Sequence, residues 1–248
     1  MALKFSYMGW AVVLSRMLGG FATMGVLHRI AAVALIALFA FHLSRVWKGR
    51  KASGKSWFAY IFDKNSLMFN LTDIRQIWES IKWFFGRGPR PHYGRFTYWE
   101  KFDYFAVFWG VFVIGSTGLV LWFPEFFTRL LPGWSVNVAT IIHSDEALLA
   151  VAFIFTIHFF NTHFRPDKFP MDPVIFTGRV PVEELRHDKP AEYDELMASG
   201  SIAEIDAKLL DAYPKRLEKA FKTFGFIALG TGLTLIALIV YAMLFGYR

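Results

Sequence analysis

Four long apolar segments constrain this 248-residue chain more than any other feature. A helix needs about 20 residues to cross a hydrocarbon core that is roughly 30 Å thick. Because 55% of the residues are hydrophobic and 19% are aromatic, the composition excludes an ordinary water-soluble domain. The sequence predicts an all-α fold, a bundle of four transmembrane helices that span about residues 20–47, 104–123, 138–164 and 221–244.

The basic residues predict how these helices are oriented. Of the 27 Lys and Arg residues, 12 lie within residues 45–101 and 10 lie within residues 165–222. Because basic loops stay preferentially in the cytoplasm, we expect cytoplasmic loops at about 48–101 and 165–220. Both termini are then periplasmic in a bacterial inner membrane. Nucleic acid is the other interpretation of the positive charge, but these charges flank the spans, so no nucleic-acid partner is expected.

Shorter segments predict smaller helices within this single membrane domain. The apolar segment 5–18 lacks the basic start and cleavage site of a signal peptide. It predicts an N-terminal interfacial helix, with an uncleaved signal anchor as the alternative. Apolar spacing in 72–85 and the composition of 190–198 predict short cytoplasmic helices. Prolines within 166–181 predict irregular chain.

Four histidines occupy two of the predicted spans at similar spacing: His28 and His42 in the first, His143 and His158 in the third. At 100° per residue, His42 falls within about 40° of His28, and His158 falls within about 60° of His143. Each pair is separated by about 21 Å along its helix. Because the charge pattern makes the two helices parallel, His28 should lie level with His143 near the outer face, and His42 with His158 near the inner face. The spacing predicts two bis-imidazole sites, each holding the iron of one haem b.

Other interpretations apply to any one of these histidines. A single intramembrane histidine can serve as a proton relay, as a satisfied polar contact or as a metal ligand. Four histidines at two matched depths favour haem, because each neutral imidazole would otherwise need a partner in a medium that offers none. The chain contains no cysteine, so covalent attachment of haem through a C-x-x-C-H motif is excluded.

Several residues near the four histidines can be interpreted in more than one way. Arg29 is a candidate partner for a haem propionate, or it extends to the membrane interface. Asp145 and Glu146 are expected to cap the third span or to face a partner, and a carboxylate could also orient His143. Small residues allow either approach of a macrocycle or ordinary helix packing: Gly25, Gly110, Gly115 and Gly118. Three glycines in the last span predict packing against another subunit: Gly225, Gly230 and Gly232.

A family resemblance rests on several short segments. They are GRFTYWEK at 94–101, Thr117-Gly118, Trp122-Phe123-Pro124, and the histidine contexts Val26-Leu27-His28, Ile142-His143 and Ile157-His158. Over residues 25–178 the chain resembles the gamma subunit of respiratory formate dehydrogenase and the cytochrome b subunits of thiosulfate reductases and nickel–iron hydrogenases. The resemblance implies that His28 and His143 bind an outer haem and that His158 binds an inner one.

The chain also departs from that family. The family takes the other ligand of its inner haem from an additional helix, and His42 would replace that ligand here. The quinone-side motif of the family reads G-[KR]-[FY]-N-x-x-Q-K, whereas this chain has Thr97 in place of Asn and Glu100 in place of Gln. The last span is extra and contains no histidine.

The expected function is that of a di-haem b-type subunit of a respiratory complex, which transfers electrons between a periplasmic partner and the quinone pool. The partner would be an oxidoreductase or a multihaem cytochrome c, other membrane subunits would join it, and the quinone would be menaquinone or ubiquinone. Thr97 is the candidate quinone contact near the cytoplasmic face. The candidates for proton transfer are Glu100, His163 and Asp167. His163 is rotated by about 140° from His158, which makes it a surface or quinone-site residue.

Two alternatives remain open. One is a haem-bearing membrane anchor that relays electrons without a quinone site of its own. The other is a transporter or channel with a histidine proton relay, which predicts no haem absorbance.

Overall fold

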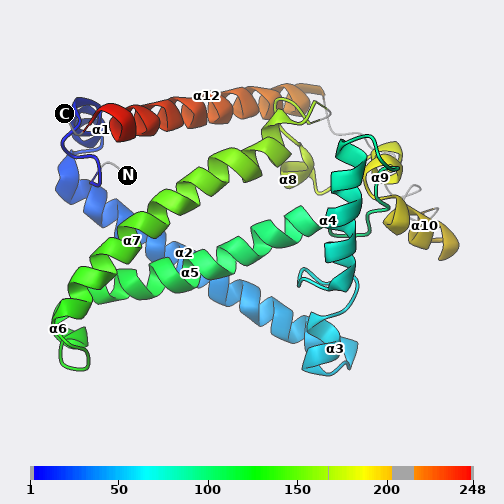
Figure 1. The fold of residues 1–248 in the computed structure, drawn as a ribbon, viewed down its shortest axis with the longest axis horizontal. Helices are drawn as coiled ribbons and strands as arrows, with labels where there is room; N and C mark the ends of the chain where they lie inside the picture. Colours follow the sequence, from blue (N-terminus) through cyan, green and yellow to red (C-terminus); the bar gives the residue numbers. More distant parts are fainter. Residues whose placement is uncertain (1–2, 167, 203–214, 247–248) are drawn as a thin grey trace. The chain divides into compact units, whose positions relative to one another are not determined.

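The computed structural model describes residues 3–166, 168–202 and 215–246, and these residues contain helices and no strand (Figure 1). Four helical stretches are long and apolar enough to cross a membrane: Gly20–Ser53, Tyr98–Trp122, Ser135–Phe164 and Leu217–Phe245. They belong to α2 (Gly20–Ser53), to α5 (Tyr98–Trp122), to α7 (Trp134–Phe153) with its π-helical continuations η1 (Ile154–His158) and η2 (Phe160–Phe164), and to α12 (Lys215–Phe245). The all-α fold with four candidate spans is confirmed.

The helices are longer than the apolar segments that predict them. α2 continues past the predicted end at residue 47 and stops before Gly54, which has a left-handed φ of 66°. α5 begins at Tyr98, before the predicted start at residue 104, because the Glu100 carboxylate accepts a hydrogen bond from the Thr97 backbone at 2.8 Å. Hydropathy therefore locates the apolar part of each helix, whereas capping residues determine where the helix begins and ends.

The chain divides into two compact units. We call Met1–Trp47, Val107–Met171 and Thr223–Arg248 the span unit, and Lys48–Ala106 with Asp172–Lys222 the loop unit. The long helices α2, α5 and α12 have residues in both units. All four of the predicted haem ligands lie in the span unit.

The span unit has a small buried core at the N-terminus of the chain. Its fully or nearly buried members come from the N-terminal segment and from the last helix: Phe5, Ala11, Ile239 and Ala242. The N-terminal helix α1 (Gly9–Met17) is shorter than the predicted segment 5–18, because the chain forms turns before Gly9. The short helix α6 (Pro124–Phe127) lies between α5 and α7 in the chain.

Two glycines of α12 lie against other residues of the span unit. A Cβ atom at Gly232 would collide with the rings of Phe155 and Phe159, and one at Gly225 would lie 2.6 Å from the Met171 Cβ. The prediction that these two glycines serve contacts with another subunit is therefore wrong, since side chains of the same chain fill the space beside them. A Cβ atom at Gly230 would meet no neighbouring atom within 4 Å.

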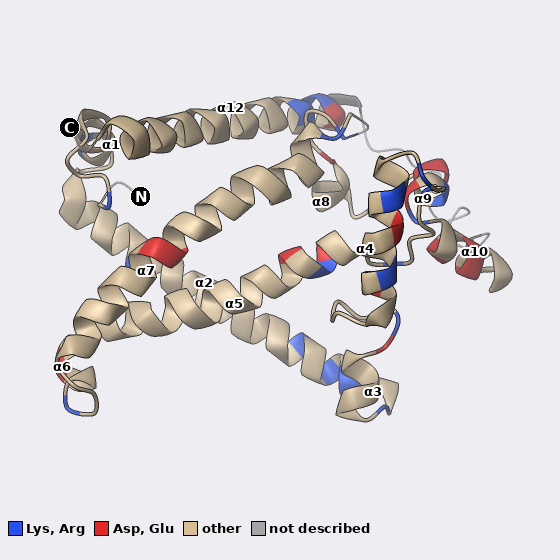
Figure 2. Ribbon diagram, viewed as in Figure 1, with Lys and Arg blue, Asp and Glu red and all other residues tan. Residues whose placement is uncertain are grey.

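The described part of the loop unit contains five short helices: α3 (Trp57–Ile61), α4 (Leu71–Phe84), α8 (Val174–Thr177), α9 (Val182–Asp188) and α10 (Pro190–Ala198). The predicted helices at 72–85 and 190–198 are confirmed by α4 and α10. The other three have four to seven residues, too few to produce a periodic pattern. Charged residues are frequent on α4, α9 and α10, whereas long stretches of α5, α7 and α12 contain none (Figure 2).

Candidate functional site

The structure brings His28 of α2 and His143 of α7 together within the span unit. Their ring centroids are 6.0 Å apart and their ring planes meet at 83°. The spacing argument predicts this pair, and the contact between the two rings agrees with that prediction. His28 is exposed and His143 is half-buried, so the pair lies at the edge of the packed side chains.

The His143 ring is held in one orientation by α5. Its Nδ1 atom lies 3.1 Å from the Ile114 carbonyl oxygen and 3.2 Å from the Thr117 hydroxyl. A carbonyl oxygen can only accept a hydrogen bond, so Nδ1 carries the proton and Nε2 keeps its lone pair. The Thr117 hydroxyl lies 2.7 Å from the Val113 carbonyl, to which it donates, and its oxygen remains able to accept from Nδ1.

Gly118 allows the His143 ring to lie against the backbone of α5. A Cβ atom at position 118 would be 3.1 Å from the Cε1 atom of His143. A side chain at this position would therefore push the ring away from Ile114 and Thr117. The sequence singles out Gly118 as a small residue, and the structure gives the reason for its small size.

The residue types and the separation of this pair suit two histidine ligands of a haem iron. An iron atom between two opposing imidazole nitrogens, at about 2 Å from each, would hold the ring centroids roughly 6 Å apart. The observed separation is 6.0 Å, and the free Nε2 of His143 is the form that binds a metal. Cβ atoms at Gly25, Gly110 and Gly115 would meet no atom within 4 Å. These positions therefore leave space beside the backbone.

The inner histidines have different surroundings. The His42 ring lies 6.1 Å from the Phe108 ring of α5, and Phe108 in turn contacts Phe39 at 4.9 Å. His158 is exposed and ends the π-helical segment η1. The pairing of His42 with His158 stays a prediction.

The π-helical turn reconciles the unequal histidine spacing. His28 and His42 are 14 residues apart in regular α-helix, whereas His143 and His158 are 15 residues apart. The Phe159 backbone donates to the Ile154 carbonyl, five residues back, so this turn contains one residue more than an α-helical turn. Fifteen residues that include η1 therefore turn through about the same angle as 14 in an α-helix, and His158 returns to within about 40° of His143.

The other face of the π-helical region packs against α12. Phe155 contacts Phe159 at 4.6 Å between ring centroids, and Phe159 contacts His163 at 4.7 Å. His163 is 7% exposed, and its Nδ1 lies 2.8 Å from the Pro170 carbonyl, to which it donates. The surface interpretation of His163 is therefore wrong, because its ring is enclosed by neighbours and hydrogen-bonded to backbone.

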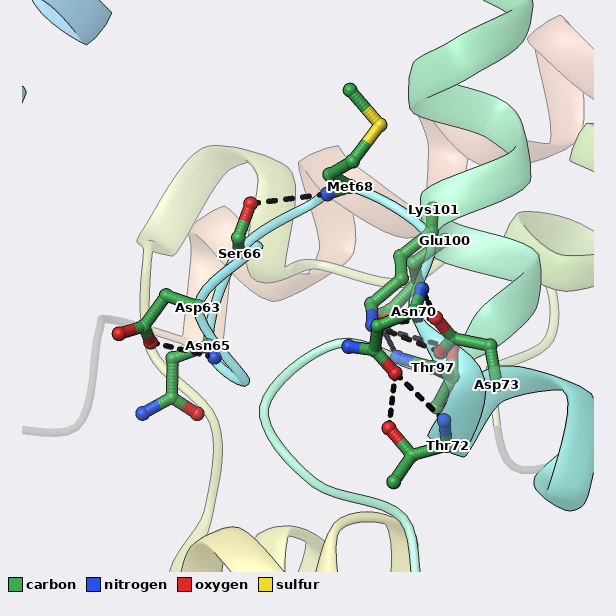
Figure 3. A network of polar contacts seen from close by, with 10 residues as sticks. All are labelled: Asp63, Asn65, Ser66, Met68, Asn70, Thr72, Asp73, Thr97, Glu100 and Lys101. Carbon is green, nitrogen blue, oxygen red and sulfur yellow. Dashed lines mark hydrogen bonds and ion pairs between the residues drawn. The ribbon is translucent and has the colours of Figure 1, made fainter. Parts of the chain in front are cut away.

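The quinone-side candidates Thr97 and Glu100 form the start of α5 (Figure 3). One Glu100 carboxylate oxygen accepts from both the backbone and the hydroxyl of Thr97, each at 2.8 Å. The other oxygen accepts from the Lys189 ammonium at 2.9 Å. Thr97 is 2% exposed. These are the contacts of a helix cap, and the proposed quinone contact and proton transfer stay predictions. Asp167, the third candidate for proton transfer, lies outside the described residues.

A buried ion pair lies next to this cap. The Lys101 ammonium contacts both Asp73 carboxylate oxygens, at 2.9 and 3.0 Å, and the two side chains are 3% and 2% exposed. Asp73 also accepts from the Asn70 backbone at 2.7 Å and so caps α4 (Figure 3). The sequence analysis missed this pair, because its members are 28 residues apart and no local pattern connects them.

The remaining charged candidates have partners other than a histidine. Arg29 lies over the Trp122 ring at 5.7 Å. Asp145 pairs with Lys4 at 2.6 Å, and Glu146 accepts from the Trp109 indole at 2.5 Å. Because α7 begins at Trp134, these carboxylates lie well inside the helix and the prediction that they cap it is wrong. The group that orients His143 is the Ile114 carbonyl, not a carboxylate.

Among residues 3–166, 168–202 and 215–246, no cluster of three or more His, Asp or Glu side chains could hold a metal ion. A haem iron needs only two axial histidines, so this finding bears on free metal ions rather than on haem. Comparisons of the chain with protein-family models, with curated proteins and with solved structures give no match.

Proposed function

We propose that this chain is a di-haem b-type membrane subunit of a respiratory complex, which transfers electrons between a periplasmic redox partner and the quinone pool. The partner is an oxidoreductase or a multihaem cytochrome c, and the quinone is menaquinone or ubiquinone. The observation that carries the proposal is the geometry of the His28 and His143 rings. Their centroids are 6.0 Å apart, and the hydrogen bond to the Ile114 carbonyl places the His143 proton on Nδ1.

Each residue of the outer pair has a distinct role in this proposal. His28 and His143 would hold the haem iron, and haem would supply reversible one-electron transfer when it is bound. The Ile114 carbonyl accepts a hydrogen bond from Nδ1–H of His143, which fixes the ring plane and would strengthen Nε2 as a ligand. Gly118 keeps the space that this orientation requires. His42 and His158 are the proposed ligands of the inner haem.

The surface of the span helices supports a function within a membrane complex. No residue of α2 is buried, and Lys101 is the only buried residue of α5. Apolar side chains in this quantity need lipid, a cofactor or other membrane subunits around them. In the proposed complex, lipid, haem and other membrane subunits all cover this surface. The periplasmic partner carries out the substrate chemistry at the outer face.

A count of haem per chain tests the outer site. We expect two haems b in the purified wild-type protein by the pyridine haemochrome assay, and one in His28→Ala and in His143→Ala. The double variant should also retain one haem, because both residues serve the same iron. The exposed His92 outside the spans is the matched control, and His92→Ala should retain both haems.

Three results would contradict this proposal. A double variant that loses both haems would show that His28 and His143 serve different sites. Loss of haem in His92→Ala as well would indicate a general effect of histidine removal. Well-folded wild-type protein without haem would refute the cytochrome function and leave the proton relay, which is the transporter alternative.

A second function is favoured by the start of α5. Thr97 and Glu100 are engaged with each other and with Lys189, which supports a haem-bearing anchor that relays electrons without its own quinone site. Glu100→Gln separates the two functions. A quinone site that uses Glu100 for proton transfer predicts slower quinone turnover and an altered pH dependence. The relay predicts that electron transfer to a periplasmic acceptor continues without quinone and is unchanged by the substitution.

A further inference from the structure

The helix α4 carries its apolar side chains outward. Leu71, Ile74, Trp78, Ile81 and Phe85 recur every three or four residues and so form one stripe along the helix. Each of these side chains is exposed, with Ile74 at 65% and Trp78 at 59%. A surface helix of a water-soluble protein shows the opposite arrangement, because its apolar face is buried.

Polar side chains of α4 face the rest of the loop unit. Asp73 pairs with the buried Lys101, and the Ser80 hydroxyl lies 2.7 Å from the Tyr93 hydroxyl. Tyr93 is 3% exposed, and this burial raises the pKa of its phenol. These contacts determine which face of α4 points inward, so the apolar stripe is left outside by the fold itself.

The ion pair holds α4 at the point where α5 becomes apolar. Lys101 lies in the first turn of α5, and the uninterrupted apolar part of that helix follows Asp103. Since Tyr98–Trp122 is long and apolar enough to cross a membrane, the first turn of α5 marks the membrane surface. Figure 1 shows α4 running across the start of α5 rather than alongside it. A helix in this position can lie along the surface.

The residues beside the stripe fit a phospholipid surface. The Lys82 ammonium lies 5.5 Å from the centroid of the Trp78 ring, and Arg75 pairs with Glu79 on the neighbouring part of α4. Long basic side chains at the edge of an apolar stripe can reach lipid phosphates while their stems stay in contact with apolar groups. Tryptophan favours the same depth, at the level of the headgroups.

From these observations we infer that α4 is a monotopic membrane helix, whose apolar stripe lies in the headgroup and acyl boundary of a bilayer that contains anionic phospholipid. The ion pair between Asp73 and Lys101 sets its depth, and Lys82 and Arg75 contact lipid phosphates. This inference does not depend on haem or on the proposed electron transfer.

A depth measurement on the full chain tests the inference. Because the chain contains no cysteine, a nitroxide can be placed uniquely with Ile74→Cys or Ile81→Cys. The labelled protein is reconstituted in vesicles of phosphatidylcholine and phosphatidylglycerol. Collision of the label with oxygen, which enters the bilayer, is then compared with collision with a nickel chelate, which stays in water. Leu71→Cys, at 83% exposure, gives a third position on the same stripe.

The matched control is Glu183→Cys, which is exposed on α9 of the same unit. We expect the oxygen-to-nickel ratio at the three stripe positions to be severalfold higher than at position 183. Equal ratios at all four positions would place the stripe in water and overturn the inference. Protection of the stripe from both reagents would also overturn it, because a protein surface, such as a second copy of this chain, would then cover α4.

Discussion

The span unit and the loop unit satisfy their polar groups in different ways. In the loop unit, Asp73, Lys101 and Thr97 are almost completely buried and each has partners within that unit. In the span unit, His28 and His158 are exposed on long helices with little buried surface. These buried polar groups of the loop unit are therefore paired with other groups of that unit, whereas the span unit exposes two histidines and a large apolar surface.

The comparison also separates two kinds of histidine within the span unit. His163 is buried against Phe159 and donates to a backbone carbonyl, so its contacts are complete without a ligand. His143 likewise donates from Nδ1, but its other nitrogen belongs to a ring paired with the exposed His28. A backbone acceptor therefore occurs in both kinds of histidine, and the facing imidazole of His28 is what distinguishes His143.

The largest predicted effect concerns the two helices that carry the histidine pairs. Deletion of Ala34 from α2 shortens the spacing of His28 and His42 from 14 positions to 13. His42 is then turned to about 140° from His28, and we expect loss of one haem. Deletion of Thr156 from η1 should convert the π-helical turn to an α-helical turn and keep both haems. Haem per chain is the measurement.

Deletion of Leu244, which is exposed near the end of α12, is the control for shortening a membrane helix, and it should leave haem content unchanged. Equal losses from the deletions of Ala34 and Thr156 would contradict the role of η1 in setting the direction of His158. Retention of both haems after deletion of Ala34 would contradict the common face of His28 and His42.

The next largest effect concerns the buried ion pair of the loop unit. Asp73→Ala leaves the Lys101 ammonium buried without its carboxylate, which should lower the free energy of unfolding on the order of 3–5 kcal/mol. Lys101→Met in the same chain should recover most of this loss. Unfolding in mixed micelles, with hydrogen exchange of the α4 amides as a local probe, measures both effects.

The exposed pair Arg75–Glu79 on the same helix is the matched control. Glu79→Ala should cost about 0.3–0.5 kcal/mol. A loss from Asp73→Ala no larger than that from Glu79→Ala would remove the distinction between the buried, paired polar groups of the loop unit and the exposed histidines of the span unit.

Much of the fold was predictable because it depends on summed properties of long segments. Membrane thickness fixes the length of an apolar span, so hydropathy located all four. The helix at 72–85 was predictable from its repeating apolar side chains. The short helices α3, α8 and α9 were not, because a single turn or two carries no such repeat.

Only those parts of the site that consist of distinctive side chains could be predicted from the sequence. Spacing and charge together paired His28 with His143. The Ile114 carbonyl had no signal, because every residue has a backbone carbonyl. One local signal was available but was interpreted differently: Thr97-x-x-Glu100 is the pattern of a capping box.

A smaller effect is expected at the cap of α5. Glu100→Ala removes the acceptor for the Thr97 backbone and should lower the free energy of unfolding by about 1 kcal/mol. Glu100→Gln should cost less, because a glutamine oxygen can still accept that hydrogen bond. Lys189→Ala, which removes the ion pair with Glu100 and a hydrogen bond to the Arg95 carbonyl but leaves the acceptor for the Thr97 backbone, is the control. Hydrogen exchange of amides in the first turns of α5 measures these losses, and equal losses in all three variants would contradict the capping role.

The smallest predicted effect concerns an ion pair on the surface of the loop unit. A hydrogen bond from Lys55 and one from the Asn65 backbone hold the pKa of Asp63 below its usual value of 3.8. A carboxyl group with a lowered pKa in the folded state contributes stability above 3.8, and the contribution is lost as pH falls through the folded pKa. Because both side chains are partly exposed, the contribution at neutral pH should be about 0.5 kcal/mol.

Asp63→Asn measures this contribution, since the amide oxygen can still accept from the Asn65 backbone while the charge is absent. We expect the wild type to be slightly more stable than the variant at neutral pH, and the difference to vanish once Asp63 is protonated. Added salt should reduce the difference at neutral pH, because exposed charges are screened. A difference that persists in acid would show that Asp63 acts through its shape in the turn rather than through its charge. This surface turn would then be held by hydrogen bonds that do not depend on pH, unlike the buried ion pair between Asp73 and Lys101.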